Sequence, residues 1–304
     1  MLSLLLNSFL PVAFLILLGF VSAKKDVFDY KQSLAILKYV GVVAVPALTL
    51  KMIISINLSN LNWILLSSYI LSELIIYIIA ALLAKYIFKF EWHECILIGM
   101  AASFANHLLF VYPIALNEYD EALIAPIISI IGFDVVFLVL NLIILDLITL
   151  KNMSSKNIVL KQFTNLPLIA LLAGLLIIVI DIKLPIAFSR SLEFISGSAA
   201  PCALFAAGII LAQKLEKTQL RISNLIILFK VVLHPLLAIL IIWNINSIEF
   251  STSETTIMVA AAPVGLMALV FSTQYGVNPS AITRALMITT LLSILTIPLS
   301  STLS

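Results

Sequence analysis

ANHLLFVYP, residues 105–113, interrupts one long apolar stretch of the chain, and AAAPVG, residues 260–265, interrupts another. Proline removes a backbone donor and clashes with the preceding helical turn, while asparagine and glycine tolerate non-helical backbone. We therefore expect both stretches to be broken helices. The half-helix N-termini left by such breaks carry free N–H groups and a partial positive charge, which favours an anionic ligand. One proline alone would most often only kink a helix, but two breaks at corresponding places in the two halves favour a functional pair.

A second repeated motif precedes each break in the sequence. VPAL, residues 45–48, returns as APCAL, residues 200–204, and an interrupted apolar stretch follows each copy at a similar distance. Such correspondence between two halves indicates a membrane transporter built from inverted repeats.

The composition independently indicates a membrane protein. Hydrophobic residues make up 62% of the 304 residues and charged residues only 11%, and the mean hydropathy is +1.20. A soluble domain could not hide this much apolar surface from water. The first apolar run has no basic residue before it and no small-residue cleavage site after it, so we interpret it as a retained span. Ten runs could cross a hydrocarbon core of roughly 30 Å, near 4–22, 33–55, 62–88, 95–117, 122–148, 163–181, 188–213, 219–244, 254–276 and 280–302.

The basic residues fall mainly on one side of these spans. Lys and Arg accumulate in cytoplasmic loops, and twelve of the 17, Lys156 among them, lie in the odd-numbered connections or just after span nine. Lys183 falls on the opposite side. Both termini are therefore expected outside a bacterial-type inner membrane. Five spans per half is an odd number, so the halves, 1–150 and 151–304, must have opposite topology. The longest polar connector, about 150–162, is too short to fold alone.

Four motifs spread over nearly the whole chain are shared with a known family. They are VPALTL (45–50), Asn106 followed seven positions later by Pro113, APCALFAAGIILA (200–212) and AAAPVGLMALVFSTQYGVNPSAITRALMITTLLSILTIPL (260–299). Together they resemble the auxin efflux carrier family, which includes plant PIN carriers and bacterial malonate, malate and related organic-acid permeases. The chain departs from the family where Asn106-His107-Leu108 replaces the usual Asn-Thr-Gly and where Val111 replaces a usual Gly.

The resemblance implies an all-α fold of ten transmembrane helices, in which helices 4 and 9 are broken and cross at their centres. Helices 1, 2, 6 and 7 would form a scaffold, and helices 3–5 and 8–10 would form a mobile transport domain of the elevator type. The substrate carboxylate would be held near the crossing. The candidate substrate-binding residues are Asn106, His107, Pro113, Pro263, Val264 and Gly265, with Pro46 and Pro201 in the matching scaffold motifs.

Ionisable residues away from the span ends are the candidate ion-coupling groups, because a charge at the bilayer centre is costly and is normally buried in the bundle. Glu73 lies in the middle of span three, where the resemblance places an acidic residue near the ligand cavity. Its alternative role is a protonated or hydrogen-bonded packing residue. Asp134 lies in the middle of span five, where it either accepts a proton or makes a structural hydrogen bond to a neighbouring helix.

Lys230 occupies nearly the repeat-related position of Glu73, and His234 lies one helical turn further on the same face. Two readings stay open: the pair meets an acid from the other half, or Lys230 snorkels to the interface, since it lies only about nine residues past Arg221.

His107 directly follows the crossing asparagine, and the ordinary pKa of histidine lies near physiological pH. It is therefore either a ligand for substrate or proton, or a packed and hydrogen-bonded side chain. The run EWHEC, residues 91–95, contains metal-ligand residue types. Consecutive positions cannot converge well on one ion, so we interpret this run as a solvated helix start.

Secondary transport is the favoured function class. The sequence shows no GxSxG, HExxH, P-loop or protease-type aspartate pair, which argues against an enzyme. The spans are too apolar for the continuous polar pore of a channel or gated sensor. We expect a small organic anion as substrate, no cofactor and no nucleic acid. An ion gradient, of H⁺ or Na⁺, or the membrane potential would supply the energy, and a homodimer is left open. A sodium-coupled symporter of the bile-acid type is the alternative, with oxygen ligands from Ser103, Asn106, Thr273 and Gln274.

Overall fold

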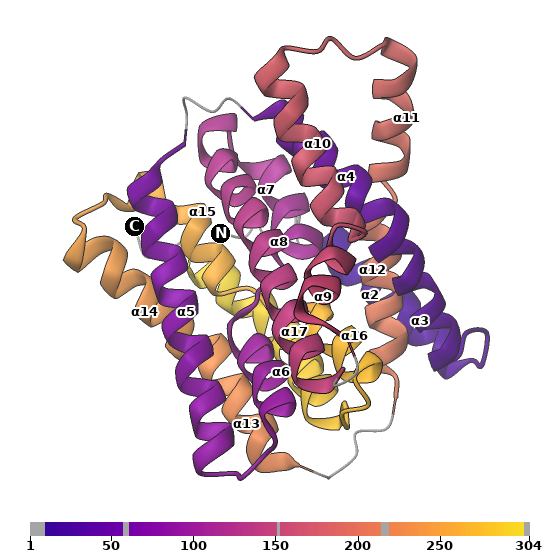
Figure 1. Cartoon of the computed structure of the whole chain (residues 1–304), viewed down its shortest axis with the longest axis vertical. Helices are drawn as coiled ribbons and strands as arrows, with labels where there is room; N and C mark the ends of the chain where they lie inside the picture. The colour runs from indigo at the N-terminus through magenta and orange to yellow at the C-terminus, as the bar shows by residue number, and fades with distance from the viewer. Residues whose placement is uncertain (1–9, 57–60, 151–152, 214–218, 301–304) are drawn as a thin grey trace. The chain divides into compact units, whose positions relative to one another are not determined.

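The computed structural model describes residues 10–56, 61–150, 153–213 and 219–300, and within them all regular structure is helical (Figure 1). The α-helices are α2 (Leu10–Lys24), α3 (Tyr30–Tyr39), α4 (Val45–Ser55), α5 (Trp63–Tyr86), α6 (Trp92–Ser103), α7 (Tyr112–Glu118), α8 (Glu121–Thr149), α9 (Ser155–Gln162), α10 (Leu166–Ile180), α11 (Ile186–Ser196), α12 (Ala199–Leu211), α13 (Leu220–Leu228), α14 (His234–Ile239), α15 (Phe250–Ala260), α16 (Leu266–Gln274) and α17 (Ser280–Ser300). The π-helical segments are η2 (Val40–Ala44), η4 (His107–Val111), η5 (Phe229–Leu233) and η6 (Leu240–Ile245).

Several helical stretches are long and apolar enough to cross a membrane. In the part of the chain that the structure describes, five meet this condition, namely Tyr30–Ser55, Trp63–Tyr86, Glu121–Thr149, Ile186–Leu211 and Leu220–Asn244. The pair α9 and α10, bent by 64°, would make a sixth if it forms one span. The chain is thus a multi-pass membrane protein, and the ten-span topology stays a prediction.

Three of the π-helical segments precede a proline. The segments η2, η4 and η5 each end two residues before one, at Pro46, Pro113 and Pro235. A proline ring clashes with the carbonyl four residues earlier and cannot donate to it, and a widened turn relieves that clash. The prolines singled out from the sequence therefore widen helices as well as break them.

The helices divide into two compact units. Of the described residues, unit 1 contains 62–130 and 219–300, and unit 2 contains 10–56, 61, 131–150 and 153–213. The boundary passes through α8, between Ile130 and Ile131.

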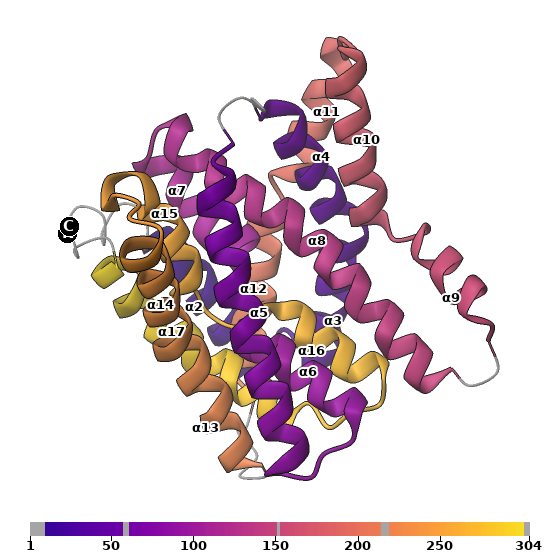
Figure 2. The same cartoon turned by 60° about the vertical axis from the view of Figure 1, so that its left-hand side comes forward.

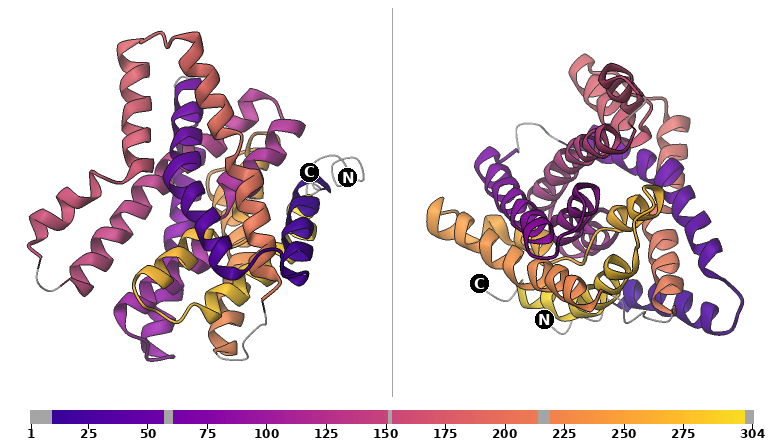
Figure 3. Two further views of the ribbon diagram at one scale, coloured as in Figure 1. Left: turned by 90° about the vertical axis from the view of Figure 1, so that its right-hand side faces the viewer. Right: turned by 60° about the horizontal axis from the view of Figure 1, so that its bottom comes forward.

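Unit 2 is held by close contacts of small residues. A Cβ atom added to Gly19 on α2 would lie 2.0 Å from the carbonyl oxygen of Phe205 on α12, and one added to Gly208 would lie 2.0 Å from that of Ile16. Only glycine allows the two backbones to approach this closely, which is how helices commonly associate in membranes. Helices α10 and α11 follow one another through a short loop, at the top of the left panel of Figure 3.

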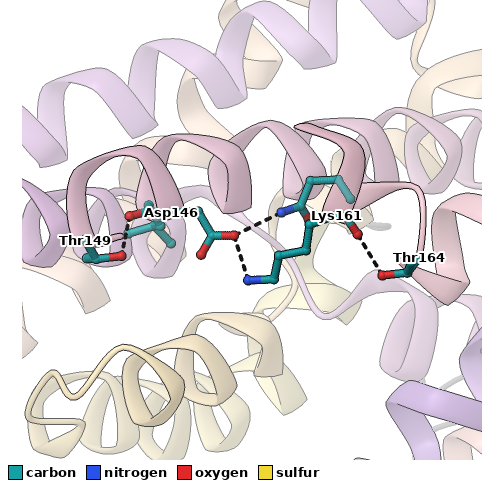
Figure 4. A network of polar contacts seen from close by, with 6 residues as sticks. Asp146, Thr149, Lys161 and Thr164 are labelled. Carbon is teal, nitrogen blue, oxygen red and sulfur yellow. Dashed lines mark hydrogen bonds and ion pairs between the residues drawn. The ribbon is translucent and has the colours of Figure 1, made fainter. Parts of the chain in front are cut away.

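The connector between the two sequence halves is also fixed within unit 2. Asp146, near the end of α8, is 2% exposed and accepts hydrogen bonds from Lys161 Nζ at 2.9 Å and Gln162 Nε2 at 3.1 Å (Figure 4). The connector thus contains a short helix, α9. The last two residues of α9 attach it to α8.

Unit 1 contains the two broken helices and the helices packed around them. Helix α5 runs beside α13 and α14, as Figures 1 and 2 both show. Helix α6 begins at Trp92, and the Glu91 N–H donates to Glu94 Oε2 at 2.9 Å. The interpretation of the run 91–95 as a helix start is therefore confirmed. Within the described residues, no group of three or more His, Cys, Asp or Glu could hold a metal ion.

Candidate functional site

The candidate site is the place in unit 1 where the two interrupted helices meet. Helix α6 ends at Ser103 and helix α15 ends at Ala260, so the expected interruptions near Asn106 and Pro263 are present. The extended segments that follow pair through an antiparallel bridge between Ala105 and Val264. We call residues 104–106 and 263–265 the crossover.

Two backbone hydrogen bonds fix the crossover. The Asn106 N–H donates to the Pro263 carbonyl oxygen at 2.9 Å, and the Gly265 N–H donates to that of Phe104 at 3.0 Å. A Cβ atom added to Gly265 would lie 3.3 Å from the carbonyl oxygen of Ala105. Glycine at 265 therefore permits the close approach of the two backbones. From the sequence we expected only that it would tolerate non-helical backbone.

Helix α17 supplies hydroxyl groups for the α15 side of the crossover. The Val264 N–H, which would bond to Ala260 if α15 continued, donates to Thr289 Oγ1 at 3.1 Å. The Ala261 carbonyl oxygen accepts from Thr296 Oγ1 at 3.0 Å. Neither threonine was expected at the site from the sequence. Their spacing of seven residues, two helical turns, places them on one face of α17 and could have indicated a shared role.

Lys230 supplies the donor for the carbonyl groups at both helix ends. Its Nζ lies 3.0 Å from the carbonyl oxygen of Ser103 and 3.2 Å from that of Ala260, the last residues of α6 and α15. His234 Nδ1 lies 3.0 Å from the same nitrogen. Lys230 is 0% exposed, so the snorkelling interpretation is wrong: the side chain turns inward, where helix-end carbonyl groups lack intrahelical donors.

Glu73 lies at the level of Lys230. Along α5, the ring of Tyr69 lies 5.6 Å from that of His234, whereas Ile76 packs with Phe229. The two helices are therefore antiparallel, and Glu73, which lies between Tyr69 and Ile76, falls opposite the segment that contains Lys230. Glu73 and His234 are both fully buried. The structure thus brings three of the four candidate ion-coupling residues together in unit 1.

Asp134, the fourth candidate, falls in unit 2. It lies in α8 and is 6% exposed, so it is as deeply placed as its apolar surroundings predicted. Pro46 and Pro201 also fall in unit 2, at the second residue of α4 and the third of α12. Pro46 is half-buried and Pro201 is exposed. The candidate residues are therefore divided between the two units.

Asn106 and His107 begin the second half of the first broken helix. Both side chains are buried, and His107 Nδ1 lies 2.9 Å from the carbonyl oxygen of Ala105. A carbonyl group only accepts, so Nδ1 carries the hydrogen in this bond and the imidazole caps the crossover backbone. Pro113 is half-buried at the second residue of α7.

Of the four residues considered for sodium, Asn106 lies in the crossover and Ser103 directly before it, but the other two lie elsewhere. Thr273 and Gln274 lie at the far end of α16, both exposed, and Thr273 Oγ1 donates to the carbonyl oxygen of Val270. They follow Gly265 by about nine residues of helix, a rise of about 13 Å. The Ser103 carbonyl oxygen accepts from Lys230 instead.

Comparisons with known proteins identify the family of the chain. The chain matches the family model described as membrane transport protein over residues 4–146 and 150–301. Over 125 residues it is 31% identical to a protein of Rhizobium meliloti (strain 1021) named "Putative malonate transporter", which covers 41% of this chain and 39% of that protein. Over 312 residues it is 21% identical to "Lysosomal cholesterol signaling protein" of Mus musculus, which covers 92% of this chain and 35% of that protein.

The matched region is thus less than two-fifths of the length of either relative. The family model, in contrast, matches nearly the whole of this chain. The chain therefore belongs to the membrane transport protein family, that of the auxin efflux carriers.

Proposed function

We propose that this chain is a secondary transporter of small organic anions, mono- or dicarboxylates of the size of malonate. The observation that carries the proposal is the crossover in unit 1, where two half-helices begin and where two others end at a fully buried lysine. Helix starts present N–H groups to an anion, and the lysine adds positive charge. The name of the Rhizobium meliloti relative supports a dicarboxylate as the first substrate to test.

The anion binds beside Asn106 and His107 on one side of the crossover and beside Pro263, Val264 and Gly265 on the other. The Asn106 amide group donates to a substrate carboxylate. A role for His107 in binding substrate or proton runs through Nε2, since Nδ1 bonds to the carbonyl group of Ala105.

Transport proceeds by alternating access in a ten-helix, inverted-repeat fold with both termini outside. Unit 1 carries the crossover. We propose that spans three to five and eight to ten move as the transport domain, while spans one, two, six and seven serve as the scaffold, with Pro46 and Pro201 in the scaffold motifs. Two compact units of this kind support an elevator-type motion.

Proton coupling through Glu73 supplies the energy, with Asp134 and His107 as further candidates for the coupling group. A deprotonated Glu73 would repel a bound anion, whereas a protonated one would not, so proton and anion favour each other's binding reciprocally. Symport of the two follows.

The test is uptake into proteoliposomes of radiolabelled malonate, with malate, acetate and a bile acid as competitors. Gradients of pH and of sodium are imposed separately, and empty liposomes are the control. We expect saturable malonate uptake, driven by an inwardly directed proton gradient and unchanged by sodium. Absence of uptake and of counterflow for every carboxylate would contradict the proposal.

A further inference from the structure

The Lys230 amine occupies a place that would suit a small inorganic cation. The last carbonyl groups of a helix carry partial negative charge and have no intrahelical donors. At this point two such helix ends, those of α6 and α15, converge on one nitrogen atom. In other transporters with broken helices, carbonyl groups at half-helix C-terminal ends coordinate the coupling cation.

The donor count of an ammonium group matches this place. A lysine ammonium has three N–H donors, and Lys230 Nζ has three hydrogen-bond partners within 3.2 Å: the carbonyl oxygens of Ser103 and Ala260, which can only accept, and His234 Nδ1. A neutral amine has only two N–H groups. The partial negative charge of the two helix ends favours the charged form over the neutral amine. In that form Lys230 donates to all three partners, and His234 is neutral and protonated on Nε2.

The surroundings also contain groups that respond to this charge. Glu73 lies at the same level on α5, Tyr69 contacts the His234 ring, and His107 interacts electrostatically with Lys230. The ammonium group is thus central to the polar interior of unit 1.

We propose that Lys230 is a resident cation of the crossover: its ammonium group holds the ends of α6 and α15 together in the place of a bound metal ion. The uptake measurements that test this inference rest on the proposed function, whereas the unfolding measurements do not. Two consequences follow. The unaltered protein needs no sodium, and removal of the lysine side chain opens a site for a monovalent cation of the ammonium class.

The first experiment uses the unaltered protein. Malonate uptake and the midpoint of thermal unfolding are measured in sodium chloride and in choline chloride at equal ionic strength and pH. We expect no difference between the two salts. Stimulation of uptake or stabilisation by sodium would overturn the proposal, because the cation site would then not be filled by the lysine.

The second experiment compares Lys230→Ala with Lys230→Met. Both remove the charge, but methionine fills the space of the lysine side chain and alanine leaves it open. We expect both variants to lose at least about tenfold in uptake, as loss of a charge-assisted hydrogen bond implies. Ammonium or methylammonium chloride should restore Lys230→Ala and leave Lys230→Met unchanged. Lys51→Ala, which removes an exposed lysine in an ion pair with Glu193 in unit 2, is the matched control.

The outcomes separate the two proposals. If the unaltered protein carries no organic anion, the proposed function fails, and the cation site is still read from thermal unfolding of the Lys230 variants with and without ammonium. Lys230→Met that transports like the parent, or Lys230→Ala that ammonium neither restores nor stabilises, would overturn the resident cation. If neither variant can be purified, the comparison of sodium with choline in the parent decides.

Discussion

At the scale of single residues, Asn106 contributes to the crossover in two separate ways. Its backbone N–H pairs with the Pro263 carbonyl group, a bond that any residue except proline could make. Its side chain is the candidate ligand of the substrate. A substitution can therefore remove the second contribution and keep the first.

We expect Asn106→Ala to weaken malonate binding by about 1.5–3 kcal/mol, the usual contribution of a hydrogen bond to a charged group. This corresponds to about 10- to 150-fold in Kd. The thermal unfolding midpoint should stay close to that of the parent. Isothermal titration of purified protein measures the affinity, and Asn117→Ala, an exposed asparagine on α7, is the control. Equal affinity in parent and Asn106→Ala would remove Asn106 from the site.

Glu73→Gln tests the proton coupling. Glutamine keeps the size of the side chain but cannot ionise, so anion binding should lose its increase at low pH. Accumulation driven by a pH gradient should disappear, whereas exchange of malonate across the membrane should persist. The measurement is gradient-driven uptake beside counterflow in the same proteoliposomes, with Glu193→Gln, an exposed carboxylate, as control. Unchanged gradient-driven accumulation in Glu73→Gln would eliminate Glu73 as the coupling group.

At the scale of the helices, the sequence predicts where helices break better than it predicts what completes the breaks. Proline and glycine act on their own backbone, so the interruptions at 105–113 and 260–265 follow from local chemistry. The end of the Lys230 side chain is several bonds from the backbone, and only the packing of α5, α6 and α15 decides that it turns inward. The same holds for Thr289, because nothing local shows that its hydroxyl meets an amide 25 residues earlier.

Thr289→Val should destabilise unit 1, because it removes the acceptor of the Val264 N–H and leaves that buried donor without its partner. The expected loss is about 1–3 kcal/mol of unfolding free energy. Thr289→Ser keeps the hydroxyl group and should stay close to the parent. Unfolding in detergent, followed by thermal or denaturant titration, measures the difference. Equal stability of the valine and serine variants would show that the bond from Val264 contributes nothing.

At the scale of the whole molecule, the distribution of basic residues predicts which side of the membrane each connection faces, whereas helix lengths predict only which helices can span. Lys and Arg resist translocation, so the connections that hold most of them should face the cytoplasm. Both ends of α10 carry a suitable reporter: Lys156 lies in α9 before it and Lys183 lies in the loop after it, and both are exposed. A single helix separates them.

We therefore expect these two positions to lie on opposite sides of the membrane. In a background with Cys95 and Cys202 replaced by serine, Lys156→Cys and Lys183→Cys are each labelled in intact cells with a membrane-impermeant maleimide. Lys183→Cys should react at once, and Lys156→Cys should react only after the membrane is permeabilised, because α10 crosses the bilayer between them. Transport by both variants serves as the control that the chain is correctly inserted. Labelling of both positions from outside would mean that α10 does not span the membrane. Labelling of Lys156→Cys alone would mean that the termini face the cytoplasm and that the orientation inferred from the basic residues is reversed.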